Sequence, residues 1–330
     1  MTLLQYEDLR VTLPGTARPV LDGISLHVGA GETVSLVGES GSGKSVTARA
    51  ALGLFPAGAE VTGRVLVDGT DLVGADTARL REVRTAKAAM IYQDPRAAIN
   101  PVRRVGDFLT ESLRLVHGWT KDRALTRAAE LLGAVGLPDP ARHLRQYPHE
   151  LSGGMLQRVV IAAALTAEPR LLLCDEPTTA LDVSTQAEIL AVLGRLRRER
   201  GLGLLLITHD VELAASVSDR IYVMYAGRIV ETAPVTELFT APRHPYTAGL
   251  IASSPPLDGH PAGRLTPIPG APTGLTESAP GCAFAPRCAF AEPGRCDRSV
   301  PALQAHGPSR AACHRAGELT LTPHAHQETR

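Results

Sequence analysis

The stretch Gly38-Glu39-Ser40-Gly41-Ser42-Gly43-Lys44-Ser45 has the form Gly-x4-Gly-Lys-Ser of a phosphate-binding loop. In such a loop, glycines let successive backbone N–H groups wrap a phosphate. Lys44 would reach the β and γ phosphates as a compact charge, and Ser45 would bind Mg²⁺. A strand must precede the loop and a helix must follow it, and the runs 33–37 and 46–54 predict those elements. The stretch therefore predicts a triphosphate site, the simpler alternative being a glycine-rich turn.

Two further runs, 171–174 and 204–207, are nearly all apolar and are bounded by glycine or charged residues. They predict strands that are buried on both faces. Buried strands separated by helices predict an α/β fold with a mostly parallel sheet. From about 95 to 167 the pattern turns helical, with apolar residues three and four apart over 105–116 and 123–135. We therefore expect a helical subdomain inserted into the α/β core.

The composition of the chain changes near residue 236. Fourteen of the 25 prolines lie between 236 and 330, a density that excludes long helices and central strands there. The sequence therefore predicts two parts, a nucleotide-binding domain over 1–235 and a loop-rich C-terminal region over 236–330.

The overall charge is balanced, since the 330 residues include 34 Lys and Arg and 34 Asp and Glu. A neutral chain lacks the general attraction that nucleic-acid or membrane-surface binders need, so we expect no nucleic-acid partner and a local site for any bound anion. The first residues do not resemble a signal peptide, and no apolar run is long enough to cross a membrane. We expect a soluble intracellular chain, in which structural disulfides are rare.

An acidic pair, Asp175-Glu176, ends the predicted strand 171–174. Acids at a strand end are common and carry little information alone. At a strand end that faces a phosphate loop, however, Asp175 can hold Mg²⁺ through water and Glu176 can polarise the attacking water. We therefore assign Asp175 to the metal and Glu176 to general-base catalysis.

The motif Leu151-Ser152-Gly153-Gly154-Met155, followed by Gln157-Arg158, lies in the predicted helical subdomain. Ser152 can cap a helix predicted over 155–167, and the two glycines expose N–H groups that have no local partner. An ordinary capped helix would also explain the motif. With a phosphate loop about 110 residues upstream, however, the sequence resembles the ATP-binding cassette (ABC) ATPase family, whose signature is this motif.

The resemblance places the other motifs of the family. Gln93 matches the glutamine that touches Mg²⁺ and senses membrane subunits, and His209 matches the histidine that contacts the γ-phosphate. Ala180-Leu181-Asp182 matches the loop that crosses to the partner domain. Members of the family stack an aromatic ring on adenine near the position of Leu13, where this chain has no ring, so Leu13 and Val20 are the candidates for that contact.

The same resemblance implies an antiparallel β subdomain beside the parallel core. It also implies that ATP is bound between the phosphate loop of one subunit and the signature motif of another. Because this chain has one loop and one signature, it would act as half of a pair. Closure of the pair would complete the hydrolytic site with Glu176 and His209, and would move whatever is docked on the helical subdomain.

The C-terminal region indicates which subgroup of the ABC ATPase family the sequence resembles. Arg243-His244-Pro245-Tyr246-Thr247, the run 268–272 and a cysteine cluster resemble ATPases of oligopeptide and dipeptide importers, a group that includes nickel importers. The resemblance implies a second, non-identical ATPase subunit, two transmembrane permeases and an extracytoplasmic peptide-binding protein, at the cytoplasmic face of the membrane. The alternative is a soluble ABC ATPase acting on DNA or ribosomes, which is disfavoured because those proteins carry long coiled coils or two cassettes.

Four of the five cysteines crowd into 282–313: Cys282, Cys288, Cys296 and Cys313. In a reducing compartment such a cluster favours a metal site over disulfides. Structural zinc uses closely spaced cysteine pairs, and none occurs here, whereas a [4Fe–4S] cluster needs four converging thiolates without fixed spacing. We predict a [4Fe–4S] cluster on these four residues, with zinc and unligated thiols as the alternatives.

Overall fold

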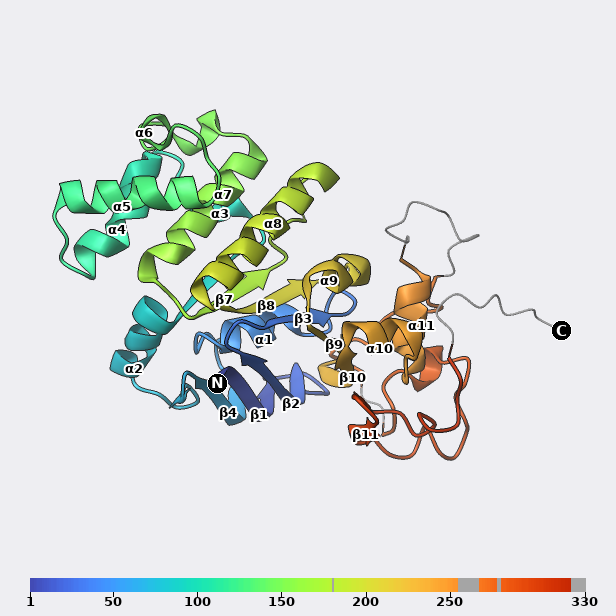
Figure 1. Cartoon of the computed structure of the whole chain (residues 1–330). Coiled ribbons are helices and arrows are strands. Elements are labelled where there is room, and N and C mark those ends of the chain that lie inside the picture. The colour runs from blue at the N-terminus through green and yellow to red at the C-terminus, as the bar shows by residue number, and fades with distance from the viewer. Residues whose placement is uncertain (180, 255–266, 278–279, 322–330) are drawn as a thin grey trace.

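The computed structural model describes residues 1–179, 181–254, 267–277 and 280–321. In these ranges two sheets form the centre of the molecule, a group of helices lies at one end, and the C-terminal region lies at the other (Figure 1). Ala180, from the predicted crossing loop, lies outside the described residues, as do 255–266, 278–279 and 322–330 of the predicted C-terminal region.

The smaller sheet is antiparallel and has the strand order β2-β1-β4-β5. Its strands are β1 (Thr2–Thr12), β2 (Leu21–Gly29), β4 (Glu60–Val67) and β5 (Thr70–Asp71). In β1, Tyr6, Leu9 and Val11 are buried, whereas Gln5 and Arg10 are exposed, so the sheet presents one apolar face to the core. The expected antiparallel β subdomain is confirmed.

The larger sheet has the order β11-β12-β10-β9-β3-β8-β7-β6. Its parallel strands are β3 (Thr33–Val37), β6 (Ala88–Ile91), β7 (Leu171–Asp175), β8 (Gly203–Thr208) and β9 (Arg220–Tyr225). All residues of β3, β7 and β8 are buried, as expected for strands covered on both faces. The α/β class and the predicted strands are confirmed, with β7 and β8 slightly longer than predicted.

Five helical segments connect or flank these strands: α1 (Lys44–Ala50), α2 (Thr77–Glu82), the π-helical η1 (Val83–Lys87), α8 (Val183–Arg200) and α9 (Val211–Val217). The prediction of a helix over 46–54 was wrong at both ends. Helix α1 begins at Lys44 because the phosphate loop itself turns into the first helical residues. It ends at Ala50 because successive turns follow it and Gly53 has a left-handed φ of 62°.

The inserted helical subdomain consists of α3 (Pro95–Ala98), α4 (Val105–Leu115), α5 (Lys121–Ala134), α6 (Pro140–His143), η2 (Pro148–Glu150), α7 (Gly153–Ala164) and η3 (Leu165–Ala167). Helix α4 buries Val105, Leu109 and Leu113, which lie four residues apart on one face. The prediction for 155–167 is corrected, because α7 begins at Gly153, directly after its cap Ser152, and the final turn is a 3₁₀ helix.

The C-terminal region joins the larger sheet. After β10 (Arg228–Pro234) it forms α10 (Val235–Thr240), α11 (Pro245–Ala252), η4 (Ala285–Arg287) and the hairpin of β11 (Gln304–His306) and β12 (Ser309–Ala311). Strand β12 pairs antiparallel with β10, where Ala311 lies opposite Glu231. As the proline content predicts, the helices described here are short and the added strands lie at the sheet edge. The predicted boundary at 235 falls on the first residue of α10, and the division into two domains stays a prediction.

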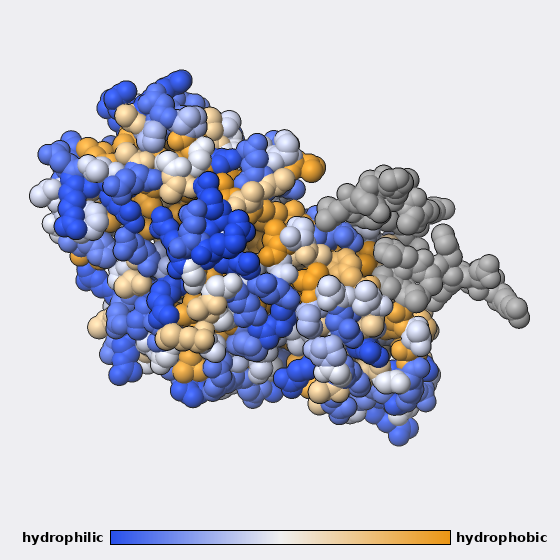
Figure 2. Space-filling view, in the orientation of Figure 1, coloured by the Kyte–Doolittle hydropathy of each residue, from blue (hydrophilic) through white to orange (hydrophobic). Residues whose placement is uncertain are grey.

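The face drawn in Figure 2 is mostly hydrophilic, and hydrophobic residues show between the helical subdomain and the C-terminal region. Among the described residues, no helix combines the length and the apolar character needed to cross a bilayer.

Candidate active site

The phosphate loop, residues 38–43, joins β3 to α1 and depends on glycine at two positions. A Cβ at Gly38 would lie 2.2 Å from the carbonyl oxygen of Met224 in β9. A Cβ at Gly43, where φ is 107°, would lie 2.8 Å from the Met224 side chain. Ser40 and Gly41 form the exposed tip of the loop. The loop therefore lies closer to β9 than any residue with a side chain would allow.

Lys44 points its ammonium group into this loop. Its Nζ donates hydrogen bonds to the carbonyl oxygens of Gly38 at 2.7 Å and Glu39 at 2.9 Å, and the residue is 6% exposed. Burial lowers the pKa of Lys44, and nearby carboxylates oppose that shift. The hydroxyl of Ser42 is buried without a hydrogen-bond partner among the described residues. A buried cation beside an unpartnered hydroxyl fits a bound phosphate.

Ser45 and Asp175 come together from α1 and the end of β7. The Ser45 hydroxyl donates a hydrogen bond of 2.9 Å to Asp175 Oδ1. Asp175 is 4% exposed, and this burial raises its pKa, while the Ser45 hydrogen bond acts in the opposite direction. A hydroxyl and a carboxylate are oxygen ligands that suit Mg²⁺. The pair therefore fits the predicted magnesium position beside the phosphate loop.

The carboxylate of Glu176 is the centre of a second group of predicted residues. Gln93 Nε2 donates to its Oε2 at 2.9 Å, and His209 Nδ1 lies 3.4 Å from its Oε1. The Thr179 hydroxyl also donates to Oε2, at 2.8 Å. Glu176 has a left-handed φ of 49°, a conformation that L-residues adopt rarely and that often marks a functional position. The structure brings Gln93, Glu176 and His209 together, as the family motifs predict.

Thr179 is a contact that the sequence reasoning missed. The only sequence signal for this contact is a hydroxyl residue three positions after Glu176, and that spacing is common in turns. Its hydrogen bond nevertheless fixes the same carboxylate oxygen that Gln93 contacts, so it orients the candidate general base.

The signature residues lie apart from the phosphate loop. Ser152 caps α7 by accepting a hydrogen bond from the Met155 N–H at 3.3 Å, and Ser152 and Gly153 are exposed. Gly154 approaches α8, where a Cβ would lie 2.5 Å from the Thr185 side chain. In the part of the chain that the structure describes, no hydrogen bond or ion pair joins 152–154 to the loop.

Asp182, from the predicted crossing loop, caps α8. Its carboxylate accepts hydrogen bonds from the Ser184 hydroxyl at 2.6 Å and from the Thr185 N–H and hydroxyl at 2.9 and 2.8 Å. These bonds, that of Ser184 first, hold the pKa of Asp182 far below its usual range. Asp182 is therefore ionised and exposed at the start of α8, rather than part of the Glu176 group.

Leu13 and Val20 are the two predicted candidates for the adenine contact. Val20 is 8% exposed. Its carbonyl oxygen packs closely against Gly43 and Gly227, since a Cβ at these positions would lie 3.0 and 2.6 Å from it. Leu13 is half-buried in the β1–β2 connection and so is the more accessible of the two.

Two residues of the C-terminal region contact the phosphate loop, which sequence reasoning did not foresee. The Tyr246 hydroxyl accepts a hydrogen bond from the Glu39 N–H, and the Arg287 guanidinium pairs with the Glu39 carboxylate. The motif around Tyr246 had been recognised, but nothing in its pattern points to a loop more than 200 residues away.

The four clustered cysteines line one small hollow in the C-terminal region, together with His244. Burial raises the thiol pKa of Cys282, Cys288 and Cys313, that of Cys313 to about 11. Across the described residues, no group of three or more His, Cys, Asp or Glu side chains is placed to hold a metal ion. As arranged, the thiols therefore share one hollow but do not form a ligand set for the predicted cluster or for a zinc ion.

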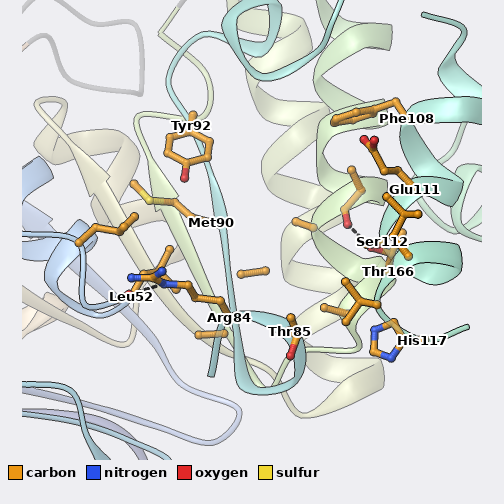
Figure 3. A pocket seen from close by; sticks show the side chains of 18 residues that line it. Leu52, Arg84, Thr85, Met90, Tyr92, Phe108, Glu111, Ser112, His117 and Thr166 are labelled. Atoms are coloured by element: carbon orange, nitrogen blue, oxygen red, sulfur yellow. Dashed lines mark hydrogen bonds between the residues drawn. The ribbon is translucent and has the colours of Figure 1, made fainter. Parts of the chain in front are cut away.

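A larger groove of about 480 Å³ lies between the core and the helical subdomain (Figure 3). Exposed apolar side chains line it, among them Leu54, Tyr92, Leu115 and Val116. Arg84, Glu111 and His117 add charged or polar groups, as Figure 3 shows. Tyr92 lines the groove. The next residue in the chain is Gln93, which belongs to the group around Glu176.

Comparisons with known proteins agree with this geometry. A family model described as "ABC transporter" matches residues 21–179, and one described as "Oligopeptide/dipeptide transporter, C-terminal region" matches 230–296. The oligopeptide transport ATP-binding protein of Bacillus subtilis is 46% identical over 293 residues, which is 88% of this chain and 82% of that protein. This chain belongs to the oligopeptide transport ATP-binding protein family. The family resemblance read from the motifs is confirmed.

Other members of this family differ in length. A putative peptide import ATP-binding protein of Brucella abortus is 44% identical and is matched over 93% of its length by 91% of this chain. The oligopeptide transport ATP-binding protein of Mycobacterium tuberculosis is 47% identical over 96% of this chain, but the match covers 52% of that protein. The chain thus spans about half the length of that relative.

Solved structures of ABC transporter cassettes share the fold of this family member. The dimeric structure of a bacterial ABC transporter cassette matches 71% of this chain and 99% of its own, with a TM-score of 0.62 and 27% identity. The cbiO1 protein of Clostridium perfringens, part of an ABC transporter complex, matches 72% of this chain and 90% of its own, with a TM-score of 0.63 and 26% identity. The ABC-type ATPase fold is confirmed.

Proposed function

We propose that this chain is the ATP-binding and ATP-hydrolysing subunit of an importer for dipeptides, oligopeptides or related small solutes. The convergence of Gln93, Thr179 and His209 on Glu176, beside the Ser45–Asp175 pair, carries the proposal. ATP hydrolysis requires a proton acceptor, a cation at the phosphates and ligands for Mg²⁺. Glu176, Lys44 and the Ser45–Asp175 pair fit these three roles. The names of the relatives support peptides as the cargo class.

In this mechanism Lys44 and the loop N–H groups hold the β and γ phosphates of ATP. Ser45 and Asp175 hold Mg²⁺, which neutralises phosphate charge when bound. A water molecule attacks the γ-phosphorus, its proton passes to Glu176, and the bond to the ADP oxygen breaks. Three side chains keep the Glu176 carboxylate in place: Gln93, Thr179 and His209.

A second ATPase subunit completes each site, and we propose that this subunit is non-identical. The exposure of Ser152 and Gly153, with no link to the loop of their own chain, supports a role for the signature on a nucleotide held by the partner. Gly154 and Asp182 stand at the start of α7 and α8 and face the same partner.

Two permeases are the proposed membrane partners, with an extracytoplasmic peptide-binding protein delivering the cargo. The apolar groove beside Tyr92 supports docking of a cytoplasmic permease segment, because four of its lining residues are exposed hydrophobics. Tyr92 lines this groove, and the next residue in the chain, Gln93, donates a hydrogen bond to Glu176. The chain would then lie peripherally at the cytoplasmic face of the membrane. The alternative of a DNA or ribosome ATPase gains no support, since the relatives named above are transport proteins.

The experiment that tests this function uses the full chain reconstituted with its permeases and binding protein in vesicles. We expect ATP-dependent peptide uptake, loss of nucleotide binding in Lys44→Ala, and retained binding without turnover in Glu176→Gln. Nucleotide binding that is unchanged in Lys44→Ala would overturn the assignment of the site. Uptake that does not depend on ATP would overturn the transport role.

The [4Fe–4S] cluster on Cys282, Cys288, Cys296 and Cys313 remains our proposal, with zinc as the alternative. Their shared hollow supports it, as does His244, whose Nε2 is buried without a partner while its Nδ1 accepts the Tyr246 N–H. The thiols would have to move closer to bind a metal. Iron, sulfide and zinc analysis of protein prepared without oxygen decides the matter: stoichiometric iron and sulfide support the cluster, stoichiometric zinc supports the alternative, and a metal-free protein contradicts both.

A further inference from the structure

Glu39, the second residue of the phosphate loop, is held from outside the loop by the C-terminal region. The Arg287 guanidinium donates two hydrogen bonds to the Glu39 carboxylate, Nη1 to Oε2 at 2.6 Å and Nη2 to Oε1 at 2.9 Å. The Tyr246 hydroxyl accepts a hydrogen bond of 2.8 Å from the Glu39 N–H. Two-point pairing between arginine and a carboxylate fixes direction as well as distance. Backbone and side chain of Glu39 are therefore both anchored.

The anchor itself is rigid. The Arg287 side chain is 5% exposed, and its Nε donates to the carbonyl oxygen of Pro269 at 2.7 Å. The rings of Tyr225, Tyr246 and Phe284 pack together beside it, with centroids 4.8 to 5.3 Å apart. Burial strengthens the ion pair because little water competes for it. Movement of Glu39 would break several contacts at once.

On the loop side, Glu39 connects directly to the lysine that faces the phosphates. Its carbonyl oxygen accepts hydrogen bonds from Lys44 Nζ at 2.9 Å and from the Ser42 N–H at 3.3 Å. The chain of contacts from Arg287 to Lys44 thus passes through a single residue. Lys44 and Ser42 are the groups that fit a bound phosphate, so the position of Glu39 sets the shape of that site.

We propose that Arg287 and Tyr246 are positioning residues for nucleotide binding, and that the C-terminal region raises nucleotide affinity by pre-organising the phosphate loop through Glu39. This inference rests on the proposed nucleotide site. A loop that is already in its binding conformation loses less conformational freedom when the ligand arrives, which strengthens binding. Arg287 lies directly before Cys288, so this contact joins the cysteine segment to the phosphate loop.

The primary test is calorimetric titration of the full chain and its Arg287→Met variant with ADP and Mg²⁺. Methionine keeps much of the buried volume and removes both hydrogen bonds to Glu39, together with the one from Nε to the Pro269 carbonyl oxygen. We expect about tenfold weaker ADP binding, the order expected when a charge-assisted pair that shapes a site is lost. For ATP hydrolysis we expect a higher KM with kcat unchanged, because ground state and transition state lose the same support.

A second variant keeps the test decisive if Arg287→Met does not fold. Tyr246→Phe retains the packed ring and removes only the hydroxyl that accepts the Glu39 N–H. We expect it to weaken ADP binding severalfold. In the Glu39→Gln background, Arg287→Met should add little further loss, because both changes interrupt one contact. Full additivity of the two effects would contradict the proposal.

Arg295 supplies the matched control. It forms ion pairs with Glu292 and Glu318 inside the C-terminal region, and among the described residues no hydrogen bond or ion pair joins it to the loop. Arg295→Met should leave ADP affinity at the wild-type value, whereas an equal loss would reduce the Arg287 effect to general loosening. Lys44→Ala separates the two hypotheses. If it abolishes binding while Arg287→Met and Tyr246→Phe bind like wild type, the positioning proposal fails and the nucleotide site stands.

Discussion

The phosphate-loop site and the signature segment are both built around glycines and a helix start, yet they differ in how complete they are. Lys44 and Asp175 are buried and hydrogen-bonded within the chain. Ser152 and Gly153 are exposed, and Ser152 does no more than cap its own helix. The side chains of the first are in place within the chain, and in this sense it is a finished site, whereas the signature segment is exposed to other molecules. The difference fits the proposal that the signature segment is a half-site that a partner subunit completes.

The largest expected effect separates chemistry from binding at the finished site. Glu176→Gln should lower ATP hydrolysis about 10³-fold, since the amide cannot accept the water proton. Nucleotide affinity should change little, because Lys44 and Ser45 remain. Phosphate release and ADP titration on the same preparation measure the two quantities, and hydrolysis at the wild-type rate would remove Glu176 from its role.

A smaller effect is expected for the metal-binding pair. Asp175→Asn should weaken Mg²⁺-dependent nucleotide binding on the order of tenfold, while binding without Mg²⁺ stays the same. Because burial raises the pKa of Asp175, protonation sets in at a higher pH than for an ordinary carboxyl group. Affinity in Mg²⁺ should therefore fall as the pH is lowered, and the Asp175→Asn variant should lack that dependence. A wild-type affinity that is flat with pH would contradict this.

Thr179→Val tests whether the orientation of Glu176 matters. Loss of one hydrogen bond to the carboxylate should lower kcat about fivefold, equivalent to ~1 kcal/mol, with nucleotide affinity unchanged. Thr179→Ser, which keeps the hydroxyl, is the control. Equal loss in both variants would show that the loss does not come from the hydrogen bond, since Thr179→Ser keeps the hydroxyl.

The smallest expected effect concerns the signature segment. Ser152→Ala removes the cap of α7 and should cost about 1 kcal/mol of unfolding free energy, measured by denaturant titration. ADP binding by the isolated chain should not change, because in the described part of the chain no hydrogen bond or ion pair joins the signature to its own phosphate loop. Weaker ADP binding in this variant would erase the distinction between a finished site and a half-site.

Sequence reasoning succeeded where the determinant is local. The loop, its preceding strand Thr33–Val37 and the Ser152 cap follow from neighbouring residues, since strand and turn preferences act over a few positions. Helix ends were less accurate, as at α1, because a loop that turns directly into a helix gives no separate start signal. The cysteines were found by count alone, and their arrangement in one hollow without a ligand set could not be read from spacing.

The sequence by itself determined the family, the phosphate-loop chemistry and the order of motifs, because each depends on residue types at short, constant spacing. Only the tertiary structure decided that Thr179 and Gln93 both donate hydrogen bonds to Glu176, and that Arg287 pairs with the Glu39 carboxylate. Those contacts join side chains from different elements, and their separation is set by the pairing of β3 with β8 and β9 and of β8 with β7. The C-terminal region, which its prolines mark as loops, thereby contacts the phosphate loop through Tyr246 and the buried Arg287.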